Sequence, residues 1–68
     1  MAPTAIVDIE YDPGNERLIV KFVTGRTYEY VDVPREVAAS FQSAFSKPTF
    51  FNIYIRDRYD FREITPAL

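Results

Sequence analysis

The sequence predicts an α+β domain, in which a three-stranded antiparallel meander packs against a C-terminal helix and a short second helix, with an extended tail. Apolar and polar residues alternate in three runs of the first half, and short turn signals separate these runs. Apolar residues recur every four positions over residues 37–45, which is the spacing of one face of a helix. Two prolines stand where helical stretches would begin.

The three alternating runs cover residues 6–11, 17–23 and 26–31. A turn over residues 12–15 joins the first two, because proline presets φ there while glycine and asparagine tolerate positive φ. Thr24 and Gly25 supply a second tight turn. The residues expected to face the core are Val7, Ile9, Tyr11, Leu18, Val20, Phe22, Tyr28 and Tyr30.

The second half of the chain predicts two helices. The first begins near Pro34, and its apolar stripe consists of Val37, Phe41 and Phe45. Ser46 is the expected N-cap of the second helix, which runs to about residue 55 and is nearly apolar all round. Residues 59–64 then form the extended tail that returns to the sheet.

Composition limits the chemistry that this chain can perform. Its 68 residues suffice for a single domain, with a core over about residues 5–64. Without cysteine or histidine it has no disulfide, no thiolate or imidazole metal ligand, and no Ser–His or Cys–His pair. The acids Asp57, Asp60 and Glu63 lack the spacing of a calcium loop. We therefore expect no enzyme, no cofactor and no metal.

The chain contains no apolar run near the ~20 residues that span a bilayer, so no membrane association is expected. Residues 1–4 have neither the basic region nor the apolar core of a signal peptide. The expected location is the cytoplasm. The net charge of −2 argues against a strong nucleic-acid binder.

The best candidate site is a basic and aromatic stretch near the C-terminus. Interleaved cations and rings can contact phosphates and stack on bases, so this stretch is a candidate RNA-binding or anion-binding surface. The alternative is a solvated face with local ion pairs to Asp57 or Asp60. The candidate residues are Lys47, Arg56, Arg58, Arg62, Tyr54 and Tyr59.

Two blocks of the sequence resemble the KTSC domain family. The first is Tyr28-Glu29-Tyr30 followed by a helix entry at residues 32–34, and the second covers residues 46–59. The resemblance spans about residues 5–64 and marks Tyr28, Tyr30, Ser46 and Asn52 as family-motif residues. It implies a stand-alone bacterial form of a domain that also ends some lysyl-tRNA synthetases. Binding of RNA, including tRNA, has been suggested for this family.

Two roles remain open for the pair Tyr28 and Tyr30. The rings could stack on unpaired bases, or they could pack beneath the helix with their hydroxyls reaching solvent. Asn52 likewise could hydrogen-bond a loop backbone or face a ligand.

Two functions from different classes therefore remain. The first is a module that binds structured RNA or another anionic partner. The second is a protein-interaction or self-association module, giving a protein partner or a homodimer. It would use an open sheet edge, the apolar second helix, or the outer sheet face with Ile19, Val23 and Val31.

Overall fold

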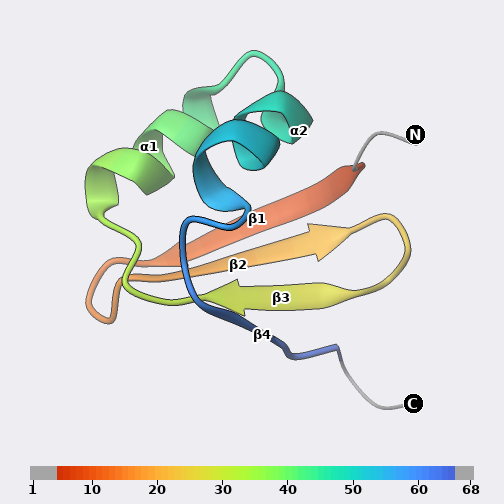
Figure 1. Cartoon of the computed structure of the whole chain (residues 1–68), viewed down its shortest axis with the longest axis horizontal. Coiled ribbons are helices and arrows are strands. Elements are labelled where there is room, and N and C mark those ends of the chain that lie inside the picture. The colour runs from red at the N-terminus through yellow and green to blue at the C-terminus, as the bar shows by residue number, and fades with distance from the viewer. Residues whose placement is uncertain (1–4, 66–68) are drawn as a thin grey trace.

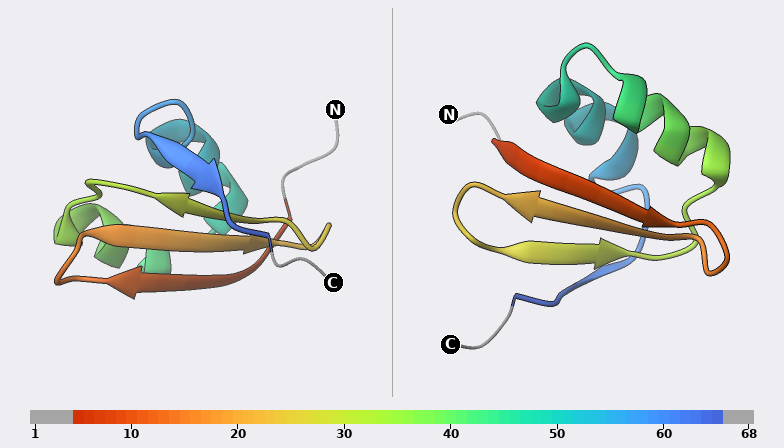
Figure 2. Two further views of the ribbon diagram at one scale, coloured as in Figure 1. Left: turned by 90° about the horizontal axis from the view of Figure 1, so that it is seen from below. Right: turned by 180° about the vertical axis from the view of Figure 1, so that it is seen from behind.

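The computed structural model describes residues 5–65, which form two layers. A four-stranded antiparallel sheet in the order β1-β2-β3-β4 makes one layer, and the helices lie together on one of its faces (Figures 1 and 2). The elements are β1 (Ile6–Asp12), β2 (Arg17–Phe22), β3 (Thr27–Tyr30), α1 (Arg35–Ser43), α2 (Lys47–Phe50), η1 (Phe51–Ile55) and β4 (Phe61–Glu63). The predicted α+β class and antiparallel sheet are confirmed. The predicted number of strands is wrong by one.

The fourth strand replaces most of the predicted extended tail. β4 pairs with β3 so that Phe61 stands opposite Tyr30 and Glu63 opposite Tyr28. Backbone bonds extend this pairing at both ends, from the Val31 amide to the Asp60 carbonyl (3.0 Å) and from Ile64 to Thr27 (2.7 Å). The strand has three residues, too few for alternation to distinguish it from a loop, and its partner lies more than thirty positions away.

A β-bulge interrupts β1. Ile6 pairs with Phe22 and Asp8 with Lys21, so Val7 is an extra residue without a partner on β2. The bulge turns Ile6, instead of Val7, toward the core, and Val7 is exposed. The expectation that Val7 faces the core was therefore wrong, whereas Ile9 and Tyr11 pack against the core as predicted.

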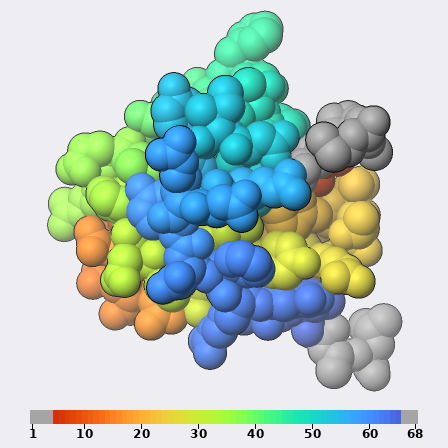
Figure 3. Space-filling model, in the orientation of Figure 1, coloured from red at the N-terminus to blue at the C-terminus, as the bar shows by residue number. Residues whose placement is uncertain are grey.

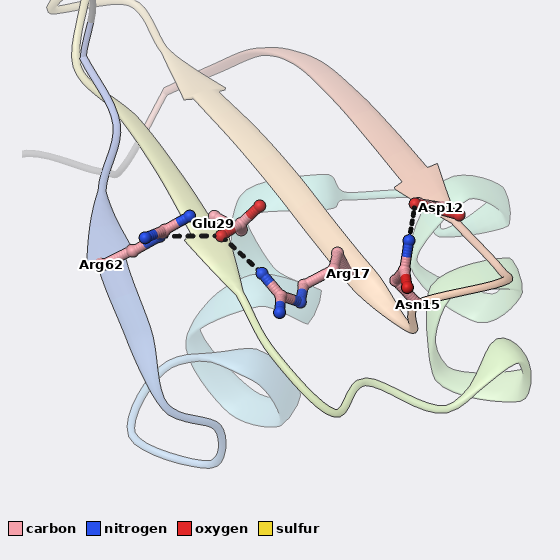
Figure 4. A network of polar contacts seen from close by, with 5 residues as sticks. All are labelled: Asp12, Asn15, Arg17, Glu29 and Arg62. Atoms are coloured by element: carbon pink, nitrogen blue, oxygen red, sulfur yellow. Dashed lines mark hydrogen bonds and ion pairs between the residues drawn. The ribbon is translucent and has the colours of Figure 1, made fainter.

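A turn forms between β1 and β2 as predicted (Figure 4), but the residue with positive φ is Glu16, and neither Gly14 nor Asn15 has this conformation. The Asp12 carboxylate accepts hydrogen bonds from the Gly14 amide (3.0 Å) and from the Asn15 side chain (2.8 Å). The bond from Asn15 is the main reason that the pKa of Asp12 lies below its usual value. Glu16, at φ 52°, accepts a backbone bond from Val33, which ties this turn to the segment before α1.

Helix α1 is shorter than its apolar stripe predicts. The Pro34 carbonyl accepts from the amides of Val37 and Ala38, and the helix ends at Ser43. Phe41 is completely buried, but Phe45 lies beyond the helix and is fully exposed. The apolar stripe does not continue to Phe45, because the backbone of Ala44 is extended (ψ 138°) and turns the chain away from the sheet.

The second helical stretch begins as predicted. The Ser46 hydroxyl accepts a hydrogen bond from the Thr49 amide (3.3 Å), and α2 continues directly into η1, a five-residue π-helix. Two of its side chains, Phe51 and Ile55, complete the core between the layers. The buried core consists of Leu18, Val20, Phe22, Tyr30, Val33, Ala38, Phe41, Phe51 and Ile55. No helix of residues 5–65 is long and apolar enough to cross a membrane.

Candidate functional site

An open groove with aromatic walls lies on the helix side of the sheet, and we call it the aromatic groove. Its volume is about 570 Å³, within the range of small-ligand sites. Figure 3 views the two layers from the edge at which β4 lies, with the helical layer above the sheet. The groove is lined by Ala5, Phe22, Val23, Thr24, Arg26, Tyr28, Tyr30, Phe51, Arg56 and Phe61.

The sheet supplies most of the groove. Period-two alternation places Tyr28 and Tyr30 on the helix side of β3, and β4 brings Phe61 to the same side. Phe22 comes from the end of β2, next to Tyr28. Two consecutive strands and one strand that is distant in the sequence thus contribute to a single wall.

The π-helix supplies the opposite side. In η1 the Arg56 amide donates to the Phe51 carbonyl (2.8 Å), five positions back rather than four. This wide turn ends the helix and leaves Phe51 and Arg56 lining the same groove. Single π turns of this kind occur frequently at functional sites.

The aromatic rings form a connected cluster. Tyr28 meets Phe22 and Phe61 edge to face, with ring centroids 5.5 Å apart in both pairs. Tyr30 packs against Phe51 at 5.7 Å and against Phe61 at 5.3 Å. Such pairs each stabilise a fold by about 0.5–1.5 kcal/mol beyond burial alone. Tyr28 is half-buried and Phe61 is 56% exposed, so part of the cluster remains accessible.

Two arginines give the groove a positive charge. Arg26 and Arg56 line it, and none of its described lining residues is acidic. Glu63 is close by, with its carboxylate 3.9 Å from the Arg26 guanidinium. A side-chain hydrogen bond with Tyr28, assisted by Glu63, raises the pKa of Arg26. Burial raises the pKa of Tyr30 to about 12, and Arg56 opposes this rise.

The structure does not bring the six predicted site residues together. Arg56 lies in the aromatic groove, whereas Tyr54, Arg58 and Tyr59 line a second groove of about 770 Å³ between α1 and η1. That second groove also contains Glu36, so its charges balance. Lys47 lies beside β1, next to Gln42.

Arg62 lies on the opposite face of the sheet (Figure 4). Its Nε donates to the Glu29 carboxylate at 2.9 Å, and Arg17 donates to the same oxygen at 3.0 Å. Within residues 5–65 this is a paired, structural arginine, well separated from the groove by the sheet.

A family model described as "KTSC domain" matches residues 3–59, most of the chain. The chain belongs to the KTSC domain family. A crystal structure of a KTSC domain protein from Yersinia pestis is 36% identical in sequence, with a TM-score of 0.86 over 94% of this chain and 90% of that chain.

Two curated proteins are also similar to this KTSC domain. A protein from Tsukamurella paurometabola is 36% identical over 56 residues, which cover 82% of this chain and 84% of that protein. A lysine–tRNA ligase from Nostoc punctiforme is 29% identical over 62 residues, or 91% of this chain. The matching stretch is only 11% of the ligase.

The family-motif residues of this KTSC domain have different positions. Tyr30 is 4% exposed and belongs to the core, as the packing interpretation predicts, while half-buried Tyr28 is accessible from the groove. Ser46 caps α2. Asn52 is exposed on η1.

Sequence reasoning missed Arg26 and Phe61 as site residues of the KTSC domain. Arg26 follows a turn and Phe61 lies in the tail, and neither belongs to a motif. The sequence did hold a signal for Arg26, which stands two positions before Tyr28 in the predicted strand 26–31. Phe61 joins the groove only through the pairing of β4 with β3, which places it opposite Tyr30. Among residues 5–65, no cluster of three acidic residues is arranged to hold a metal ion.

Proposed function

We propose that this KTSC domain is a small binding module whose partner is RNA, and that the aromatic groove is its binding site. The observation that carries the proposal is the combination, among the described lining residues, of accessible rings with two arginines and no carboxylate. Proteins that bind unstructured nucleic acid combine these same features. Arg26 and Arg56 would contact phosphates, and Tyr28 and Phe61 would contact bases.

The similarity to a lysine–tRNA ligase also supports a partner of this kind. The overall charge of −2 limits affinity, since a net negative charge disfavours the approach of phosphates. Binding should therefore be confined to the aromatic groove. It should also weaken as salt is added, because the phosphates that Arg26 and Arg56 neutralise release their bound counterions.

The test is a titration of the isotopically labelled protein with a tRNA pool, followed by amide NMR at low and near-physiological salt. We expect shifts confined to residues that line the aromatic groove. Arg56→Gln and Arg26→Gln should each weaken binding several-fold. Arg58→Gln is the matched control, because Arg58 is two positions from Arg56 but lines the second groove. Shifts outside the groove, or an Arg56→Gln variant that binds normally, would contradict the proposal.

A protein-interaction or self-association module is the second candidate. Its supporting observation is exposed apolar surface: Phe45 protrudes from the loop after α1, and Val23, which also lines the aromatic groove, is exposed. The face of the sheet opposite the helices is also open, and β1 is an edge strand (Figure 2). Sedimentation at increasing concentration tests this candidate. A monomer at all concentrations that captures no protein would count against it.

A further inference from the structure

Phe61 combines a large apolar ring with an open position. It lies on the helix side of β4, yet 56% of the residue is exposed because β4 is the outermost strand and no helix covers it. Tyr28 and Tyr30 hold the ring from the β3 side, at 5.5 and 5.3 Å. The ring is therefore fixed in place while part of it faces the groove.

A fixed and exposed ring favours a flat aromatic ligand. Covering such a ring removes apolar surface from water, and a base that stacks on an aromatic side chain contributes about 1–3 kcal/mol. A phosphate alone would use the arginines and leave the ring exposed. A duplex would do the same, since its bases are stacked on one another and hidden from side chains.

The arrangement of the arginines indicates a chain of nucleotides. Arg26 directly precedes β3 and Arg56 directly follows η1, so the two guanidiniums come from opposite sides of the groove that both residues line. A polynucleotide carries a phosphate at every step and can reach both guanidiniums, whereas a nucleoside monophosphate offers only one phosphate.

We infer that the aromatic groove recognises unpaired bases of single-stranded RNA, with one base stacked on Phe61 and phosphates of the same strand at Arg26 and Arg56. This inference rests on the proposed function and specifies its ligand. Discrimination against duplex follows from the need to reach the face of a base. Sequence preference should be small, because every base presents such a face.

The experiment uses Phe61→Trp as a fluorescence reporter, because the chain contains no tryptophan. The probes are a short single-stranded oligoribonucleotide, the same sequence as a duplex, an abasic strand of equal length, and a nucleoside monophosphate. Stacking of a base quenches indole emission. Phe45→Trp is the control for collisional quenching, because Phe45 is fully exposed and does not line the groove.

We expect the single strand to quench the introduced indole at position 61 and not the one at position 45. The duplex, the abasic strand and the monophosphate should bind at least tenfold more weakly. Phe61→Leu, which keeps an apolar side chain but removes the ring, should also lose about tenfold in affinity, with an unchanged amide spectrum in the free state.

The outcomes separate the inference from the proposed function. If the abasic strand or the duplex binds as tightly as the single strand, stacking on Phe61 is overturned while RNA binding through the arginines stands. Unchanged affinity of Phe61→Leu would overturn the inference in the same way. If none of the four probes binds at low salt, both the inference and the proposed function fail.

Discussion

Glu29 and Arg62 are joined across the outer face of the sheet, with the Glu29 Oε1 atom 2.9 Å from the Arg62 Nε atom. The same oxygen accepts from Arg17 of β2 at 3.0 Å, so one carboxylate connects three strands (Figure 4). The Glu29 side chain is 13% exposed, far less than either arginine. This network attaches the short outermost strand to the rest of the sheet.

Glu29→Gln should therefore destabilise the fold by about 1 kcal/mol, because it removes the charge that both arginines share. Urea unfolding measures the change. The loss should shrink at high salt, since both arginines are accessible to counterions. Glu10→Gln, an exposed acid on the same sheet, is the control, and an equal loss in that variant would mean that the network contributes nothing specific.

Local signals predicted most of the fold, and non-local pairing determined the rest. Strands β1 to β3 follow from alternation and from turn residues such as Pro13 and Gly25, and Ser46 marks the start of α2. Alternation could not reveal the bulge at Val7, because an extra residue changes which residues face the core without changing the pattern. The four-residue period likewise continued to Phe45 after the helix had ended.

The candidate site was predicted only in part for the same reason. Arg56 stood out because it lies in a basic stretch next to an aromatic helix. Arg58 and Arg62 share that stretch, but the turn after η1 and the pairing of β4 direct them to other surfaces. Phe61 reaches Tyr28 through a tertiary contact that sequence spacing does not encode, whereas Arg26 stands only two positions before Tyr28 in the predicted strand 26–31.

Phe41 and Phe45 offer a matched test of the core, since they are the same residue type four positions apart. Phe41 is completely buried and stacks on Phe50 with ring centroids 5.4 Å apart, whereas Phe45 is fully exposed. Phe41→Ala should cost about 3–5 kcal/mol, comparable to the whole stability expected of a domain this small. Phe45→Ala should change stability by less than about 0.5 kcal/mol.

Thermal unfolding followed by circular dichroism measures both phenylalanine variants. We expect Phe41→Ala to be largely unfolded at 25 °C and Phe45→Ala to melt like the parent protein. A clear loss of stability in Phe45→Ala would show that this side chain packs against something, and would strengthen the self-association candidate if the loss depended on concentration.

Ser46→Ala tests the cap that begins the second helical stretch. The Ser46 hydroxyl accepts from the Thr49 amide and donates to the Thr49 hydroxyl at 2.9 Å, and alanine can do neither. N-cap serines contribute about 1 kcal/mol, and this value is the expected loss in urea unfolding. Ser40→Ala, an exposed serine within α1, is the control and should be neutral or slightly stabilising. Equal effects in the two variants would exclude a capping contribution.

Tyr30 makes the stability of the fold sensitive to alkali. Burial raises its pKa from 10.0 to about 12 in the folded protein, so between these values the folded chain holds a proton that the unfolded chain has released. Stability is therefore unaffected below about pH 10 and decreases as the pH rises toward 12, by about 2 kcal/mol from this group.

Urea unfolding across this pH range measures how steeply stability decreases with pH. Tyr30→Phe should flatten this decrease, whereas Tyr54→Phe, which removes an exposed phenol, should leave it unchanged. An equally steep decrease in Tyr30→Phe would assign the alkaline sensitivity to other groups, such as Tyr11, whose pKa is also raised by burial.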